Sequence, residues 1–145
     1  MSYFNVRVYG ILINRLNQVL ISDEHEYGLD FSKFPGGGVE LGEGPKAALI
    51  REYQEECTMD IEVVELVHTT DDYVPSAFND SQVLGIYYTV TASEDALQGL
   101  TTHAIHWLKE GVSQSFRWVN VEDLQEEDLT FEMDRAAWKA FRSKT

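Results

Sequence analysis

The sequence predicts an α/β fold in which a mixed β-sheet is covered by helices on its faces. Three observations support it: β-branched and aromatic runs outnumber helical segments, the two helical segments are well separated, and a glycine-rich loop precedes the first of them. The chain has 145 residues, 43% of them hydrophobic, and no internal repeat or linker interrupts it. We therefore expect a single domain over residues 1–145.

The first half of the chain predicts two strands, a loop and a helix. Residues 4–23 hold two extended runs separated by the polar NRLNQ, which suits a hairpin. Residues 24–44 are rich in glycine, so irregular backbone with positive φ angles is expected there. The helix that follows is predicted to have Gly44 as its N-cap and Pro45 at its first position, where a missing N–H costs nothing.

The second half predicts further strands and a closing helix. Three β-branched or aromatic runs read as strands, at residues 61–69, 83–92 and 116–119. Near the end of the chain, Phe131, Trp138 and Phe141 recur at helical spacing. Thr130 stands before them as a candidate N-cap.

Charge and composition exclude several functional classes. The chain has 25 acidic and 11 basic residues, for a net charge of -14, which disfavours nucleic acids and anionic membranes as partners. No apolar run approaches the roughly 20 residues that cross a bilayer. Arg7 lies inside the first apolar segment, which does not fit a signal peptide, so the expected location is the cytosol. Cys57 is the only cysteine, which excludes an intrachain disulfide.

Three glutamates crowd the predicted helix in the segment REYQEEC. At about 100° per residue, Glu52, Glu55 and Glu56 fall within an arc of roughly 100° and share one face. Like-charge neighbours cost only about 0.2–0.5 kcal/mol each, so one interpretation is a solvated acidic face. The other is a divalent-cation site, because Mg²⁺ prefers carboxylate oxygens and backbone carbonyls.

The spacing of the residues around these glutamates favours the cation site. From Gly37 the sequence reads GGVELGEGPKAALIREYQEECTM, which resembles the Nudix box, G-x5-E-x7-R-E-U-x-E-E-x-G-U, where U is a bulky aliphatic residue. Six residues are in register with it: Gly37, Glu43, Arg51, Glu52, Glu55 and Glu56. The resemblance implies a Nudix-type α/β/α sandwich with a mixed β-sheet between helices.

Two residues depart from the box pattern. Tyr53 stands where an aliphatic residue is usual, and we expect it to pack inward with its hydroxyl bonded to a partner. Thr58 replaces the glycine that follows the helix, where a left-handed cap is expected and a β-branched side chain fits badly. A local rearrangement of the helix end is therefore expected.

The resemblance implies a Mg²⁺- or Mn²⁺-dependent hydrolase that cleaves the diphosphate linkage of a nucleoside diphosphate derivative. It places the metal on Glu52, Glu55, Glu56 and the backbone carbonyl of Gly36. Arg51 and Glu43 would form a supporting pair that orients the ligands. The general base is expected at Glu52 or at Glu110, for which a solvated loop glutamate is the alternative interpretation.

The substrate is predicted less specifically. Pro75 lies 16 positions beyond Met59, which resembles the subgroup that cleaves ADP-ribose. ADP-ribose or another nucleotide sugar is therefore the leading prediction, while dinucleoside polyphosphates and damaged nucleoside triphosphates stay open. The alternative function is a non-catalytic nucleotide-binding regulatory module on the same fold. The resemblance also allows a homodimer.

Other residues carry weaker expectations. Asp71 and Asp72 could approach the site from a loop, although such pairs more often bond their own backbone. His103 and His106 have the i,i+3 spacing of a transition-metal pair on a helix, but no third ligand stands nearby. Four aromatic residues could stack on a nucleotide base, although aromatic side chains more often lie in the core or at its rim. They are Tyr73, Phe78, Tyr87 and Trp107.

Overall fold

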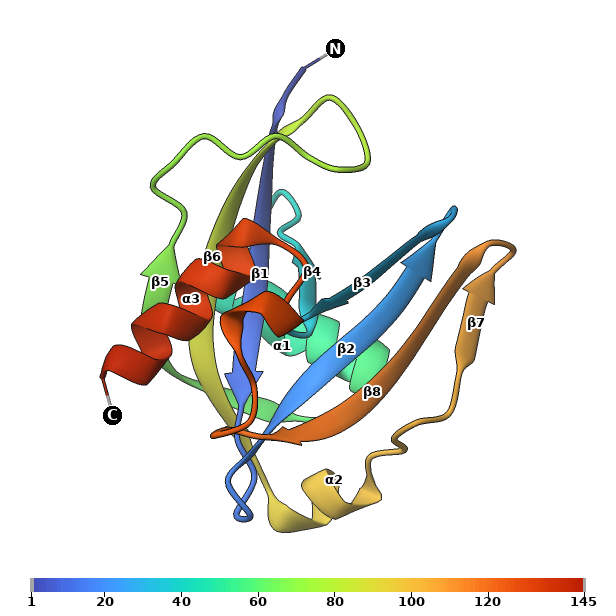
Figure 1. Cartoon of the computed structure of the whole chain (residues 1–145), viewed down its shortest axis with the longest axis vertical. Coiled ribbons are helices and arrows are strands. Elements are labelled where there is room, and N and C mark those ends of the chain that lie inside the picture. Colours follow the sequence, from blue (N-terminus) through green and yellow to red (C-terminus); the bar gives the residue numbers. More distant parts are fainter. Residues whose placement is uncertain (1, 145) are drawn as a thin grey trace.

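The computed structural model describes residues 2–144 and contains two four-stranded β-sheets (Figure 1). The first sheet is mixed, has the order β4-β1-β6-β5, and consists of β1 (Phe4–Leu12), β4 (Gly36–Gly38), β5 (Ile61–Thr69) and β6 (Gln82–Ala92). The second is antiparallel, has the order β3-β2-β8-β7, and consists of β2 (Gln18–Glu26), β3 (Leu29–Lys33), β7 (His106–Lys109) and β8 (Val112–Asn120). The predicted α/β class is confirmed, with two sheets in place of one.

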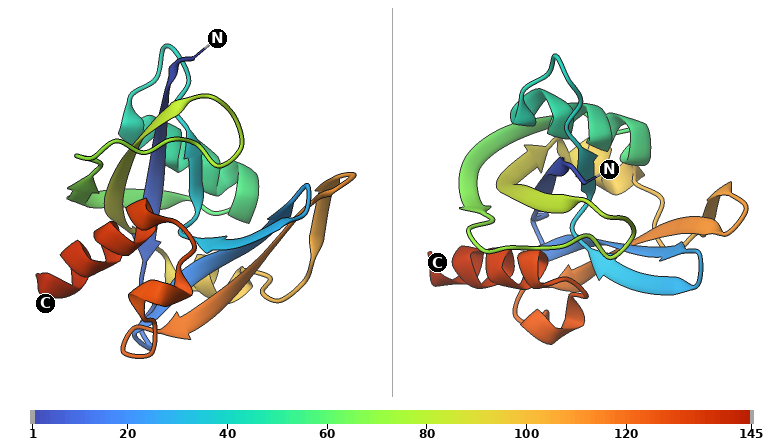
Figure 2. Two further views of the ribbon diagram at one scale, coloured as in Figure 1. Left: turned by 45° about the horizontal axis from the view of Figure 1, so that its top comes forward. Right: turned by 90° about the horizontal axis from the view of Figure 1, so that it is seen from above.

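Two long helices cover the first sheet from opposite sides (Figure 2). They are α1 (Pro45–Cys57) and α3 (Glu132–Ser143), and the shorter helices are α2 (Glu94–Gly99) and the 3-10 helix η1 (Glu126–Asp128). Both short helices and β7 were missed by the sequence prediction, because segments of three to six residues carry little periodicity. Within residues 2–144, no helix combines the length and the apolar character required to cross a membrane.

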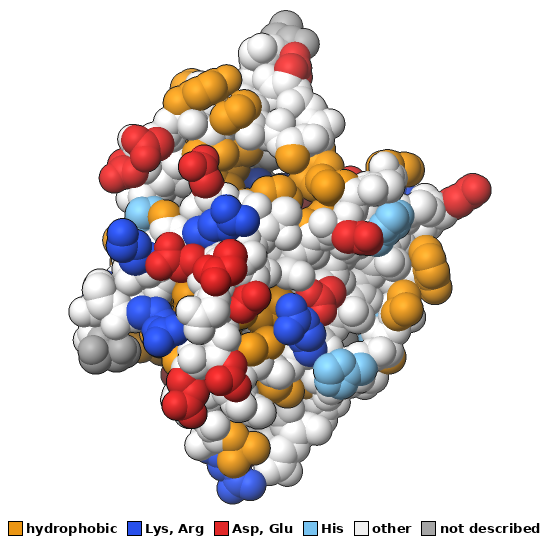
Figure 3. Space-filling model, viewed as in Figure 1, with side chains coloured by type: hydrophobic (Ala, Val, Ile, Leu, Met, Phe, Trp, Pro, Cys, Tyr) orange, Lys and Arg blue, Asp and Glu red, His pale blue; other side chains and the backbone are white. Residues whose placement is uncertain are grey.

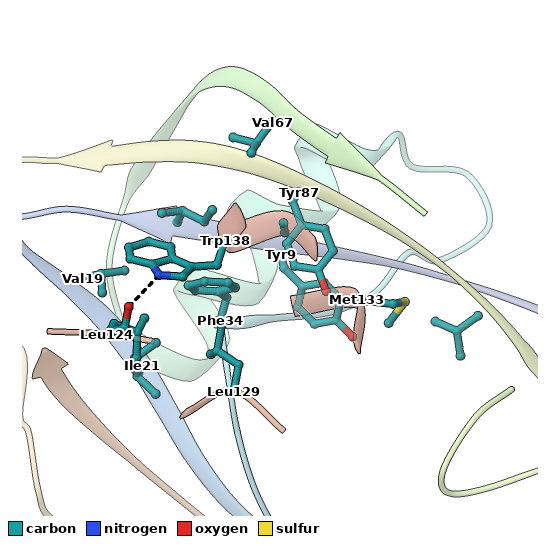
Figure 4. Packing of buried hydrophobic residues seen from close by; sticks show 13 residues of the cluster. Tyr9, Val19, Ile21, Phe34, Val67, Tyr87, Leu124, Leu129, Met133 and Trp138 are labelled. Atoms are coloured by element: carbon teal, nitrogen blue, oxygen red, sulfur yellow. Dashed lines mark hydrogen bonds between the residues drawn. The ribbon is translucent and has the colours of Figure 1, made fainter. Parts of the chain in front are cut away.

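Each face of the first sheet has its own hydrophobic core, because side chains alternate along β1. Val8 points toward α1 and packs with Leu49 and Tyr53. Tyr9 points to the opposite face, toward α3, where its ring stacks on Tyr87 with centroids 5.0 Å apart (Figure 4). On that face Trp138 of α3 is buried, and its indole N–H donates a hydrogen bond of 2.9 Å to the carbonyl oxygen of Leu124.

The predicted hairpin over residues 4–23 is wrong. β1 runs parallel to β6, whereas β2 pairs with β3 and β8 in the other sheet. The chain turns at residues 14–18, where one isolated bridge joins Ile13 to Val19, and then crosses between the sheets. Strand propensity identified both strands, but the pairing depends on distant residues that propensity does not report.

The predicted irregular loop over residues 24–44 is wrong in part. β2 continues to Glu26, and β3 and β4 occupy much of the remainder. Tyr27 and Gly28 have φ angles of 44° and 88°, the double positive φ of a tight two-residue hairpin turn. The positive φ angles predicted for this segment are confirmed at Gly28, Gly36 and Gly42, the last with a φ angle of 91°.

The structure confirms the start of α1 but not the expected rearrangement at its end. Gly44 is the N-cap and Pro45 begins the helix, while the Tyr53 side chain is buried and its hydroxyl donates to the Gly10 carbonyl oxygen at 3.0 Å. Thr58 adopts the left-handed conformation itself, with φ 51° and ψ 45°. Its N–H donates to the carbonyl oxygen of Gln54, so the usual helix cap forms with a threonine.

Replacing Thr58 with glycine is expected to stabilise the protein. The left-handed conformation costs an L-residue about 1–2 kcal/mol, and glycine avoids this cost. Glycine is also more flexible in the unfolded chain, which cancels about 0.5–1 kcal/mol of the gain. We expect Thr58→Gly to raise the free energy of unfolding in urea by about 0.5–1 kcal/mol. Thr58→Ala keeps the Cβ atom and should gain less, whereas a Thr58→Gly protein less stable than the parent would contradict this account.

The predicted cap of the last helix is wrong. Phe131, not Thr130, is the N-cap of α3. The Thr130 hydroxyl instead accepts a hydrogen bond of 2.9 Å from the Ser32 N–H, and the Thr130 N–H donates to the Ser32 carbonyl oxygen at 3.1 Å. These two bonds attach the start of α3 to β3, which places the helix beside the pocket described below.

Candidate functional site

Arg51 binds three glutamates, one on the loop before α1 and two on α1 itself. Its Nε and Nη2 atoms donate to the two carboxylate oxygens of Glu43 at 3.1 and 2.6 Å, and this contact lowers the pKa of Glu43. Its Nη1 atom donates to Glu52 Oε1 at 3.0 Å and to Glu55 Oε2 at 3.2 Å. The structure therefore brings Arg51 and Glu43 together as a bidentate pair and fixes one oxygen of Glu52.

The glycines of β4 allow α1 to approach closely. The Glu52 carboxylate lies over Gly37, where a Cβ atom would be 2.5 Å from the carboxyl carbon. A side chain at Gly36 would overlap the Val8 backbone. Gly38 contributes its carbonyl oxygen, which accepts a hydrogen bond of 2.9 Å from Arg51. The Gly36 carbonyl, predicted to be a metal ligand, belongs to this strand, and its role stays a prediction.

Glu56 extends away from Arg51 into a buried polar network. Its Oε1 atom accepts a hydrogen bond of 2.7 Å from the side-chain amide of Gln114, which also donates to Ser22 Oγ at 3.0 Å. Its Oε2 atom is buried and has no hydrogen-bond partner among residues 2–144. Burial raises the pKa of Glu56 to about 7, against the opposing effects of Lys33 and Gln114.

The network continues through two charged residues of the second sheet. Lys33 is buried, and its Nζ atom lies 3.2 Å from Glu24 Oε2 and donates to the Phe34 carbonyl oxygen at 3.1 Å. Burial would lower the pKa of Lys33, but the carboxylates of Glu24 and Glu56 hold it above its usual value. Gln114 contacts Glu24 Oε2 at 3.4 Å, so one amide side chain links Glu56 to this pair.

A cavity of about 430 Å³ adjoins the network, with Glu24 and Lys33 in its wall. Phe31, Phe78 and Phe131, from three separate segments, form an aromatic cluster there, and the Phe31 ring centroid lies 5.3 Å from each of the other two. Residues 74–79 of the loop between β5 and β6 form another wall. Hydrophobic side chains surround a hollow beneath this loop (Figure 3).

The predicted common acidic face is divided in the structure. Within residues 2–144, no three His, Cys, Asp or Glu side chains are arranged as a metal-binding group. Arg51 holds Glu52 and Glu55, whereas Glu56 is held by Gln114. The donors nevertheless fit a hard cation, because the buried Glu56 Oε2 needs a partner and carboxylate oxygens are the ligands that Mg²⁺ prefers.

The structure does not bring Glu110 into this cluster. Glu110 is exposed in the tight turn between β7 and β8. That turn lies beside the β2–β3 turn, where the Tyr27 N–H donates to the Gly111 carbonyl oxygen at 3.0 Å. Both turns form the outer tips of the second sheet (Figure 1).

The weaker candidates also lie elsewhere. His103 is in the segment before β7 and His106 is in the strand itself, so the predicted helical pair does not form. Asp71 and Asp72 line a smaller pocket with His68, which adjoins the cavity at Val74. Of the four aromatic candidates, only Phe78 lines the cavity. Tyr87 is buried in the core, and Tyr73 and Trp107 are exposed outside the cavity.

Four polar residues of this region were missed by the sequence prediction, namely Arg7, Glu24, Lys33 and Gln114. The local sequence could have identified two of them. Arg7 is a charged residue inside an apolar strand, and Lys33 directly precedes Phe-Pro-Gly-Gly. Gln114 carries no such signal, because its contact with Glu56 spans 58 positions of the chain.

Asp134 is a buried carboxyl group on α3, and its titration is expected to affect stability. Its Oδ1 atom accepts a hydrogen bond of 2.7 Å from the Tyr87 hydroxyl. Burial raises the pKa of Asp134 to about 7, against the opposing effects of Tyr87 and Lys33. Because the folded state then binds a proton that the unfolded state has released, this group makes stability fall as pH rises from about 4 toward 7.

We therefore expect Asp134→Asn to be more stable than the parent protein at pH 8, by about 2–4 kcal/mol, and similar to it at pH 4. Urea unfolding at both pH values, in EDTA, measures this difference. Asp72→Asn, at an exposed position, should leave the pH dependence unchanged. An equal pH dependence in Asp134→Asn and the parent would show that Asp134 does not titrate in this range.

The fold and the site together define an α/β protein in which an acidic helix follows a glycine-rich strand and two of the helix carboxylates are held by an arginine. The chain belongs to the NUDIX family, since the model described as "NUDIX domain" matches residues 4–139. The predicted NUDIX hydrolase assignment is thereby confirmed at the level of the family.

Individual relatives agree with this assignment. An RNA pyrophosphohydrolase from Roseobacter denitrificans is 35% identical over 65 residues, which are 45% of this chain and 41% of that protein. The match thus spans about two fifths of that relative. MutT protein from Methanosarcina mazei has a TM-score of 0.73 at 17% identity, covering 99% of this chain and 96% of that one. The E. coli ORF135 protein has a TM-score of 0.71 at 19% identity, covering 98% and 91%.

Proposed function

We propose that this protein is a divalent-metal-dependent pyrophosphohydrolase that cleaves the diphosphate linkage of a nucleoside diphosphate derivative. One observation carries the proposal: Glu56 Oε2 is buried without a hydrogen-bond partner among the described residues, close to the carboxylate network. An isolated buried carboxylate oxygen is costly, and a bound cation would remove the cost. A purely nucleotide-binding module has no evident need for such a group.

Mg²⁺ or Mn²⁺ would be held by Glu52, Glu55, Glu56 and the carbonyl oxygen of Gly36. When bound, such an ion neutralises phosphate charge and lowers the pKa of water. Glu52 is the better placed of the two predicted bases, since Arg51 holds its Oε1 atom and Glu110 lies at a distant turn. We infer that Glu52 accepts the proton of the attacking water and that Arg51 with Glu43 keeps its carboxylate in place.

The cavity supports a nucleoside as the organic half of the substrate. Its volume of about 430 Å³ is within the usual range for small-molecule sites, and its aromatic cluster offers a surface for a planar base. Pro75, the residue on which the ADP-ribose prediction depends, lines the same cavity. ADP-ribose or another nucleotide sugar is therefore our leading substrate.

The relative named as an RNA pyrophosphohydrolase suggests the phosphoanhydride bond of an RNA end as a second substrate class. The net charge of -14 argues against it, because RNA binding requires clustered basic residues along the nucleic-acid backbone. We therefore place small nucleotides first and keep the RNA end as a competing outcome of the test.

The test is a hydrolysis panel with the intact protein. ADP-ribose, UDP-glucose, a dinucleoside polyphosphate, nucleoside triphosphates and a 5′-triphosphorylated RNA are incubated with Mg²⁺, with Mn²⁺ and with EDTA. For monoester products such as AMP, phosphate is measured after addition of a phosphatase. We expect a nucleotide sugar to give phosphate release in the presence of Mg²⁺ or Mn²⁺ but not in EDTA. Absence of hydrolysis across the panel, together with nucleotide binding, would support the non-catalytic regulatory module instead.

The remaining proposals concern the whole protein. We infer that residues 1–145 act as one catalytic domain, which agrees with a family match over residues 4–139. A homodimer stays a prediction that light scattering on the purified protein can test. Location in the cytosol also stays a prediction.

A further inference from the structure

Arg7 is a half-buried cation in a strongly acidic protein, and it has no carboxylate partner among residues 2–144. Its one hydrogen bond in the described structure runs from Nε to the Tyr9 hydroxyl at 2.6 Å. By contrast, Arg15, Lys33 and Arg117 each have a carboxylate oxygen within 4.0 Å. A guanidinium group has five N–H donors, so most of those of Arg7 are available to a ligand.

Arg7 lies where an anionic ligand would be bound. It lines the cavity of about 430 Å³ together with the three phenylalanines described above. Lys33, the other basic residue of the cavity wall, is already occupied by Glu24 and the Phe34 carbonyl. Arg7 is therefore the cavity cation whose charge is not matched by a protein anion. Partial removal of a charge from water is costly unless a counter-charge or hydrogen-bond acceptors replace the water.

One strand separates Arg7 from the proposed cation ligands. Arg7 is paired in register with Gly38 of β4, and a Cβ atom on Gly38 would lie 3.9 Å from Arg7 Nη1. Successive positions of a strand face opposite sides of the sheet. The Glu52 carboxylate therefore lies against the neighbouring residue, Gly37, on the face opposite to Arg7. Burial lowers the pKa of Arg7, but Tyr9 and, more weakly, the charges of Glu52 and Glu24 hold it above its ordinary value. Arg7 is thus placed between the aromatic cavity and the carboxylates.

We propose that Arg7 binds the phosphate group attached to the nucleoside, so that the cavity recognises a nucleoside 5′-phosphate through one planar base and one anion. This inference rests on the proposed function, since it assigns the nucleoside half of the substrate to the cavity. It also sets the orientation of the substrate: the nucleoside and its own phosphate lie on the Arg7 side, and the rest of the diphosphate extends toward Glu52 and Glu56.

Binding without metal tests the inference independently of catalysis. Isothermal titration in EDTA would compare AMP, GMP, CMP and UMP with the corresponding nucleosides. Charge-assisted hydrogen bonds are among the strong ones, so the intact protein should bind its preferred monophosphate about 10–100-fold more tightly than the nucleoside. Arg7→Met should lose this preference while the nucleoside affinity stays within about twofold. If Arg7→Met does not fold, Arg7→Lys keeps the charge without the planar fork and should lose part of the preference.

Arg117→Met is the matched control. Arg117 is paired with Asp23 at 2.6 Å and is not among the residues that line the cavity, so its removal should not change the preference for the monophosphate. A preference that persists in Arg7→Met and Arg7→Lys, or its absence in the intact protein, would overturn the inference even if hydrolysis is observed. A preference that depends on Arg7 in a protein without hydrolytic activity would uphold it and reject the proposed function.

Discussion

Replacement of Glu56 by glutamine is expected to lower metal-dependent phosphate release from the preferred substrate by about 10²–10³-fold. Glutamine can still accept the hydrogen bond that Gln114 donates to Glu56 Oε1 at 2.7 Å, but it removes the charge from the buried Oε2 position. A bound cation contributes several kcal/mol of transition-state stabilisation, and each 1.4 kcal/mol corresponds to a tenfold change in rate. Initial rates with Mg²⁺, coupled to a phosphatase, measure the effect.

The stability of this variant separates loss of function from loss of fold. Burial raises the pKa of Glu56 from 4.5 to about 7, so ionisation of this carboxyl lowers the stability of the metal-free fold as pH rises through that range, and the loss is complete at pH 8. Glu56→Gln should therefore be at least as stable as the parent at pH 8 in EDTA. Glu62→Gln, an exposed change on β5, serves as the matched control. If the Glu56→Gln rate stayed within about threefold of the parent rate, the proposed role of Glu56 would be rejected.

Replacement of Gly37 by alanine is expected to have the second-largest effect, a loss of about 100-fold in activity with the fold retained. The new Cβ atom would lie 2.5 Å from the carboxyl carbon of Glu52, so this carboxylate must move. It is the far end of a flexible side chain, which can swing away at little cost to stability. A displacement of about 1 Å in a catalytic group can reduce the rate by about 10²-fold.

Gly38→Ala provides a control on the neighbouring position. Its Cβ atom would meet Arg7 Nη1 at 3.9 Å, an ordinary van der Waals contact, and would not touch Glu52. We expect kcat for Gly38→Ala to stay within about threefold of the parent value. Equal losses in both variants would show that β4 tolerates no side chain for reasons unrelated to Glu52.

The part of the site that could be predicted from sequence is the part that is local in the chain. Glu43 and Arg51 are eight positions apart, on a loop and the helix that follows it, and the resemblance to the Nudix box implied the pair that the structure shows. Gly37 was also identified as a position of the box, although the close approach of Glu52 to it was not predicted. Strand propensity identified β1, β5 and β6 of the first sheet, and the helical patterns identified α1 and α3 that cover it.

The rest depended on contacts between distant segments. The partner of Glu56 lies on β8, and the pairing of β1 with β6 instead of β2 is decided across more than 70 positions. Thr58 shows a different limit: the intrinsic cost of the left-handed conformation predicted a rearrangement, but the helix and the turn after it retain the cap with threonine in place. Local preference was overridden there by tertiary structure.

The contact between Glu56 and Gln114 also determines at which point of its synthesis the protein can become active. All residues of the Nudix box have been synthesised once Met59 is added. At that point the Glu56 carboxylate still lacks the amide donor that Gln114 supplies. A ribosome-bound chain stopped shortly after the first helix would therefore carry every recognisable motif residue and remain inactive. Activity should emerge only after β8 leaves the exit tunnel and docks, so that turnover reports on completion of the second sheet.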